Sequence, residues 1–210
     1  MKKSLLPLAA VFAVFLASCG DDNTTSPLTP NSDIALDTTE ARLAFEYLNR
    51  VRANPPAFSA ECNFNLTGVA ARPALTYNTI LERVAREKAT DMATRGYFSH
   101  QDPDGKGVDH KIVGYGYPLD SENYLIDNST CNYESLQSAG TSGGTSSLTG
   151  VKAIQGLIWD GGLPDGGHRE HLLGIGMRST LDECGVGFVR AKEGTMFKNY
   201  TCVIIAKRKR

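Results

Sequence analysis

Between residues 37 and 55, apolar residues recur every three or four positions, which predicts an amphipathic helix. Asp37 is suited to cap the start of this helix, and Glu40 completes a box-like arrangement with it. Asn54, Pro55 and Pro56 then end the helix. The residues expected on its buried face are Ala41, Ala44, Leu48 and Val51.

The same periodicity predicts a second helix over residues 78–98, stopped by Gly96, and a third over residues 148–160. Shorter helical segments are expected at 108–113 and 168–173. Residues 116–150 show no clear period, and we expect irregular structure there, with a flexible glycine- and serine-rich loop at its end, over 138–147.

Near the C-terminus, residues 184–202 alternate between apolar and polar positions on either side of a turn at 192–194, which predicts a hairpin of two strands. Helices that come first and strands that pair later indicate the α+β class, with helices packed on a small antiparallel sheet. A three-residue turn would place Cys184 opposite Cys202.

The N-terminus has the pattern of an export signal. Lys2 and Lys3 precede an apolar run over 5–17 that is too short to span a bilayer as a mature helix. The run ends in Leu-Ala-Ser-Cys at 16–19, which resembles a bacterial lipobox. That resemblance implies a signal peptide over 1–18, a lipid on Cys19, a flexible tether over 19–38 and one folded domain over 39–210. The protein would then be exported and anchored to a bacterial membrane, in the periplasm or at the cell surface.

The charge balance argues against nucleic-acid binding, and the cysteine content predicts disulfides. The chain has 22 Lys and Arg against 23 Asp and Glu, which lacks the basic excess that nucleic-acid binding requires. With Cys19 lipidated, four cysteines remain, and an even number in an exported protein predicts two disulfides. The hairpin favours Cys184–Cys202, which leaves Cys62–Cys131.

Two of the four histidines, His168 and His171, lie one helical turn apart after a glycine-rich loop. Imidazoles combined with a carboxylate suit Zn²⁺ or a similar divalent ion, and the same groups without metal could transfer protons. No zinc-peptidase H-E-x-x-H motif and no C-x-x-C pair accompanies them. The stretch GTSGG at 140–144 has the letters of G-x-S-x-G, but it follows no predicted strand, as a nucleophile elbow would require.

The landmarks together resemble the CAP superfamily, which includes cysteine-rich secretory proteins, venom antigens and pathogenesis-related proteins. The resemblance rests on four stretches and covers about residues 41 to 206: LNRVR at 48–52, ATDMATRGYFSHQDPDG at 89–105, GHREHLL at 167–173 and CGVGF at 184–188. It implies an α-β-α sandwich.

The same resemblance implies a cleft with two histidines and one or two glutamates, and it places the histidines at His100 and His168. Glu122, in SENYL, is the preferred match for the family glutamate, with Glu134, in YESLQSAG, as the alternative. His171 could orient His168 or face solvent. The second family glutamate has no clear match, and Asp160 is the nearest acid.

Two functions follow from this reading. The first is a lipid-anchored CAP domain that binds a divalent metal such as zinc together with a small-molecule, lipid or envelope ligand, without catalysis. The second is a metal-assisted hydrolase acting on cell-envelope peptides or glycans. The expected partners are the membrane, through the anchor, and this ligand, with no nucleic acid and the protein as a monomer.

Overall fold

The computed structural model describes residues 34–121, 126–141, 148–191 and 195–209. The strands are β1 (Ile34–Leu36), β2 (Thr76–Tyr77), β3 (Glu134–Thr141), β4 (Glu183–Ala191) and β5 (Phe197–Ala206). The helices are α1 (Thr38–Ala53), α2 (Thr79–Arg95), α3 (Asp109–Gly114), α4 (Gly150–Trp159) and α5 (Gly167–Leu173). Short 3₁₀ turns cover Pro55–Phe58, Asp160–Gly162 and Gly176–Thr180.

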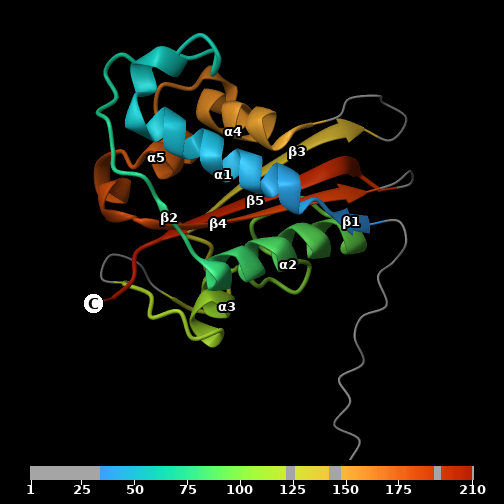
Figure 1. The fold of residues 1–210 in the computed structure, drawn as a ribbon. Helices are drawn as coiled ribbons and strands as arrows, with labels where there is room; N and C mark the ends of the chain where they lie inside the picture. The colour runs from blue at the N-terminus through green and yellow to red at the C-terminus, as the bar shows by residue number, and fades with distance from the viewer. Residues whose placement is uncertain (1–33, 122–125, 142–147, 192–194, 210) are drawn as a thin grey trace, which may run out of the picture.

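One sheet forms the middle layer, with strand order β1-β4-β5-β3 and β2 pairing with β4. The pairs within the main path are antiparallel, and β2 runs parallel to β4. In Figure 1, α2 and α3 lie below the sheet, while α1, α4 and α5 lie above it. This is the α-β-α sandwich of the α+β class that the sequence predicts. Within the described residues, none of the helices combines the length and apolar character needed to span a membrane.

The start of α1 agrees in part with the sequence prediction. Asp37 caps the helix, because its Oδ1 accepts a hydrogen bond of 3.0 Å from the backbone N–H of Glu40. The Glu40 side chain, however, turns away from the cap and accepts a 2.7 Å hydrogen bond from the backbone N–H of Gly150, at the start of α4. It also pairs with Arg190 of β4 at 3.3 Å. Glu40 therefore joins α1, α4 and the sheet.

Two glycines of β4 let α2 approach the sheet closely. A Cβ atom on Gly185 would lie 2.0 Å from the backbone nitrogen of Glu82, and one on Gly187 would lie 2.3 Å from the carbonyl oxygen of Ala85. Both contacts are with helix backbone, which cannot rotate away as a side chain could. Gly185 and Gly187 therefore fix which face of β4 lies against α2.

The hairpin forms, but its register differs from the predicted one by three residues. Cys184 pairs with Ile205, and Cys202 pairs with Gly187. Because side chains alternate between the two faces of a strand, an offset of three residues places the two cysteines on opposite faces of the sheet. The predicted Cys184–Cys202 disulfide is therefore wrong for this structure, and both thiols are free and buried. The predicted turn at 192–194 lies outside the described residues.

The predicted Cys62–Cys131 disulfide is also absent, since both residues are free thiols. Cys62 is buried beside α1, where its sulfur lies 3.7 Å from the Tyr47 hydroxyl. Cys131 instead precedes β3 and lies near His100 and Glu134. An even cysteine count does not show which thiols the fold brings together.

Three strands occupy stretches that the sequence did not predict as sheet, and one of them is the two-residue β2. β1 falls inside the expected tether, and β3 falls inside the expected irregular segment, ending in the expected loop. β3 has little β-branched or alternating character, and it is held by antiparallel pairing with β5 from Glu134 to Thr141. Tertiary pairing overrides weak local propensity in β3. The strand begins with Glu134, a candidate site residue.

Candidate functional site

A pocket of about 440 Å³ lies where the loop after α2, the start of β3 and the α4–α5 connection meet. It is lined largely by polar and titratable side chains, among them His100, Glu134, Asp160 and His168. The structure therefore brings together the two histidines that the family resemblance selects. The chain supplies them from positions 68 residues apart, so only the fold makes them neighbours.

His168 is held by Asp160, the last residue before the α4–α5 connection. Asp160 has a left-handed backbone (φ +47°) at the end of α4, and its Oδ2 accepts a 2.9 Å hydrogen bond from the backbone N–H of His168. Its Oδ1 lies 2.8 Å from Nδ1 of the same histidine. A Cβ atom on Gly166 would lie 2.4 Å from this carboxylate, so the glycine before α5 makes the close approach possible.

Arg169 holds the connection between α4 and α5, which positions Asp160 and His168. It is 2% exposed, and its guanidinium donates to the backbone carbonyls of Ile158, Trp159, Leu163 and Pro164. The guanidinium carbon also lies 3.6 Å from the centre of the Phe64 ring. One buried cation thus gathers two carbonyl groups from the end of α4 and two from the segment that connects it to α5.

His100 is held by a second carboxylate, Glu134, the first residue of β3. Its Nδ1 lies 3.0 Å from Oε1 of Glu134, whose side chain is fully buried, while the His100 side chain is 46% exposed. The buried Lys88 of α2 donates a 2.7 Å hydrogen bond to the backbone carbonyl of His100. Burial raises the pKa of Glu134, and hydrogen bonding to His100 and the charge of Lys88 partly offset that rise.

The two pairs have the same chemistry. An ionised carboxylate only accepts hydrogen bonds, so in each pair a neutral imidazole carries its proton on Nδ1 and keeps a lone pair on Nε2. The two rings lie with their centroids 6.3 Å apart and their planes 26° from parallel. Carboxylate-held histidines with a free Nε2 are the usual way in which proteins orient metal-binding imidazoles.

His171, one turn further along α5, has a different environment. It is 3% exposed at the floor of the pocket. Its Nδ1 lies 2.7 Å from the Ser135 hydroxyl, and its Nε2 lies 3.2 Å from the carbonyl oxygen of Ile205. Burial lowers the pKa of His171 to about 3. The carbonyl can only accept, so the neutral ring donates from Nε2 and accepts the Ser135 hydroxyl proton at Nδ1. The solvent-facing alternative is wrong, and His171 joins α5 to the sheet.

The family glutamate was assigned to Glu122 or Glu134. Glu134 is the carboxylate that contacts His100, whereas Glu122 lies outside the described residues. The sequence offered one signal for Glu134, since small and apolar residues follow it and it lies nearer than Glu122 to the third predicted helix. The contact between Asp160 and His168 was not predicted, although Asp160 was the nearest acid to the missing second position.

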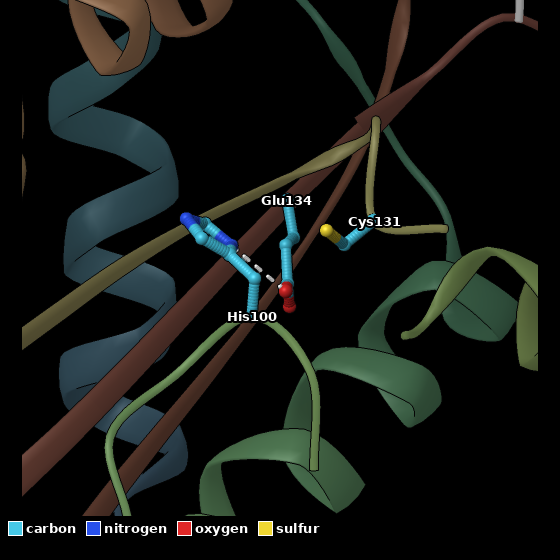
Figure 2. A group of neighbouring side chains, drawn as sticks. All are labelled: His100, Cys131 and Glu134. Atoms are coloured by element: carbon cyan, nitrogen blue, oxygen red, sulfur yellow. Dashed lines mark hydrogen bonds and ion pairs between the residues drawn. The ribbon is translucent and has the colours of Figure 1, made fainter. Parts of the chain in front are cut away.

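Cys131 is the pocket residue that sequence reasoning missed, because it had been paired with Cys62. Its sulfur, a nitrogen of His100 and a carboxylate oxygen of Glu134 all lie within 4.8 Å of one another. Figure 2 shows the thiol and the imidazole on the two sides of the Glu134 side chain. Burial raises the pKa of the Cys131 thiol. These three residue types are all metal ligands.

Comparisons with known proteins agree with this architecture. Residues 45–204 match the model of the CAP domain of the cysteine-rich secretory protein family. An outer surface protein from Borrelia burgdorferi has a similar fold, with a TM-score of 0.52 and 17% identity over 82% of this chain and 96% of that one. No curated protein matches the chain.

An extracellular protein containing an SCP domain from Bacillus anthracis is also similar, with a TM-score of 0.49 and 20% identity over 87% of this chain. The match covers 45% of that longer protein. Because the family match extends over most of the chain and includes both histidines and their carboxylates, the chain belongs to the cysteine-rich secretory protein family and folds as its CAP domain.

Proposed function

We propose that this CAP domain is a binding module that holds a divalent metal in its pocket, through Nε2 of His100 and of His168, together with a small or extended ligand. The observation that carries the proposal is the pair of imidazoles lining one pocket, each held at Nδ1 by a carboxylate. Two nitrogen donors leave further coordination positions for water or for a ligand oxygen.

The donor set fits such an ion. Imidazole nitrogen is a preferred ligand of Zn²⁺, and carboxylates behind the imidazoles increase their basicity and fix their orientation. The His168 side chain is 34% exposed and the Asp160 side chain 13% exposed, so the ring is accessible while its partner is largely shielded. When bound, the ion would supply a positive charge against which an anionic or carbonyl group of the ligand could dock.

Zinc calorimetry on the metal-free full chain tests the proposal. We expect one zinc site in the wild type, weakened more than about tenfold by His100→Ala and by His168→Ala. His110→Ala is the matched control, since His110 lies on α3 and is not among the lining residues of the pocket. Binding that is unchanged in both variants would remove this metal from the function.

We also propose that the domain acts outside the cytoplasm on a lipid anchor at Cys19. The lipobox-like segment at 16–19 supports this, as does the shared fold with an outer surface protein of Borrelia burgdorferi. Cells expressing the full chain should retain it in the membrane fraction. Cys19→Ser should move it to the soluble fraction, and an unchanged distribution would contradict the anchor.

A metal-assisted hydrolase is the second candidate, favoured by one observation. The second acid that the sequence seemed to lack is present, since Asp160 contacts His168. A bound metal would supply an activated water, and Glu134 and Asp160, behind the imidazoles, would increase the basicity of its two ligands. Metal-dependent cleavage of peptidoglycan fragments or unstructured peptides, lost in His168→Ala, would establish catalysis. An absence of turnover in metal-loaded protein would contradict the hydrolase and favour the binding module.

A further inference from the structure

The His100 ring has two nitrogen atoms, and only Nε2 binds the metal in the proposed function. The other nitrogen, Nδ1, lies 3.0 Å from Oε1 of Glu134. Figure 2 shows the Cys131 sulfur directed toward Glu134, while the second ring nitrogen of His100 points away from both residues. Nδ1, the sulfur and the carboxylate thus belong to one cluster that does not include His168.

We infer that His100 Nδ1, the Cys131 thiolate and the Glu134 carboxylate form a separate site for a thiophilic divalent cation of the Zn²⁺ or Cd²⁺ class. Sulfur, nitrogen and oxygen donors of these three residue types are the ligands that zinc takes in proteins. Three protein ligands leave the fourth tetrahedral position open toward the pocket. Hard cations such as Mg²⁺ and Ca²⁺ avoid a thiolate.

The distances in the cluster are close to those of a formed site. With bonds of about 2.0–2.3 Å, the ligand atoms around a tetrahedral zinc lie roughly 3.3–3.8 Å apart. The three ligand atoms lie within 4.8 Å of one another. Small rotations of side chains are therefore enough to close the site, and no backbone movement is required.

Burial and charge around the cluster also favour a cation. The Glu134 side chain is fully buried, and a second buried carboxylate, Asp109, acts on both Glu134 and Cys131. Lys88 is the cationic side chain that acts on both of them. Buried carboxylates are costly unless they are paired, and a divalent ion bound between Glu134 and Cys131 would offset that cost.

The site is accessible, and it can be told apart from the pocket metal. Cys131 is half-buried, and all three ligands line the pocket, which gives a cation an entry path. In the proposed function Nδ1 of His100 donates a proton to Glu134, whereas here the neutral ring carries its proton on Nε2 and binds the ion through Nδ1, so one ring serves one of the two sites at a time. The thiolate site needs Cys131 and not His168; the pocket metal needs His168 and not Cys131.

Cobalt titration of the reduced, metal-free full chain tests the inference, because a thiolate ligand gives Co²⁺ an intense near-ultraviolet charge-transfer absorption. We expect this absorption in the wild type, its loss in Cys131→Ser and in His100→Ala, and its retention in His168→Ala. Zinc should displace the cobalt from His168→Ala, which keeps the thiolate site but lacks the pocket metal. Cys62→Ser is the matched control, since Cys62 lies beside Tyr47 rather than in this pocket.

Wild-type protein that binds no cobalt, or binds it without the charge-transfer absorption, would overturn the inference even if no variant folds. Absorption that persists in Cys131→Ser would overturn it as well. If cobalt binds without the absorption and binding is lost in His168→Ala, the thiolate site fails while the proposed pocket metal stands. In Cys131→Ser, which lacks the thiolate site, zinc binding that is lost on adding His168→Ala would support the pocket metal, and zinc binding unchanged by that addition would remove it.

Discussion

The helix α5 carries two histidines one turn apart into two different environments. His168 is partly exposed in the pocket and is held by Asp160, whereas His171 is buried against the sheet and bonds to Ser135 and Ile205. The residue type is the same, and the surroundings decide whether the imidazole is a reactive group or a structural one. A histidine becomes available for chemistry here when a carboxylate fixes one nitrogen and a pocket exposes the other.

The largest expected effect on stability comes from removing the Arg169 side chain, which holds the α4–α5 connection beside His168. Arg169→Ala should destabilise the protein by about 3–5 kcal/mol, because four carbonyl groups lose a buried charged donor. Urea unfolding would measure the loss. Arg169→Lys should restore little, since an ammonium cannot reproduce the planar arrangement of donors. A stability loss below about 1 kcal/mol would mean that water molecules replace the hydrogen bonds of the Arg169 guanidinium.

Truncation of the two histidines should destabilise the protein to different extents. His171→Ala should cost about 2–4 kcal/mol, because it leaves a buried cavity and unpaired polar groups. His168→Ala should cost less than about 1 kcal/mol, because its ring is partly exposed. Thermal and urea unfolding of both variants would measure the difference. Equal losses would remove the distinction between the two environments.

The carboxylate behind His168 should matter for metal affinity more than for stability. Asp160→Asn keeps the size of the side chain but removes the charge that holds Nδ1–H, so we expect a 10- to 100-fold loss of zinc affinity. Calorimetry would measure it, with Asp165→Asn as the control, because Asp165 is not among the residues lining the pocket. An unchanged affinity would show that the metal does not depend on this pair.

The buried histidine should also make stability depend on pH. The folded-state pKa of His171 is about 3, below the ordinary value of 6.5. Between these values the unfolded chain binds a proton that the folded chain does not. Stability should therefore fall by about 1.4 kcal/mol per pH unit as the pH drops from 6.5 toward 3.

Urea unfolding between pH 7 and pH 4 would measure this slope. Other titrating groups add slopes of their own, so the informative quantity is the difference between wild type and His171→Gln. The variant should show the flatter dependence, and parallel curves would mean that His171 is not the titrating group.

The sequence predicted much of the fold and about half of the site. The helices α1, α2 and α4 have strong periodicity and clear caps, so local chemistry was enough to place them. The strand β3 could not be predicted in this way, because its pairing with β5 defines it more than its own residues do. The hairpin register depended on a turn length that residue types alone do not determine.

The candidate site likewise contains residues that the sequence could predict and residues that it could not. His100 and His168 were found from short motifs, each beside glycine or turn residues of recognisable type. Asp160 and Cys131 were missed because their significance depends on distances across the fold. Cys131 was misread in particular, since a cysteine count treats every thiol as a candidate for a disulfide.

The position of β4 in the sheet has a consequence for when the protein can fold. β4 pairs with β1, β2 and β5, so the strands from the first part of the chain have no sheet to join until residues 183–206 have been synthesised. The pocket depends on this late event, because Glu134 belongs to a strand that pairs with β5. Folding should therefore wait until almost the whole chain has emerged. The export that we propose for this protein would need an unfolded chain, and such a delay would keep the chain unfolded.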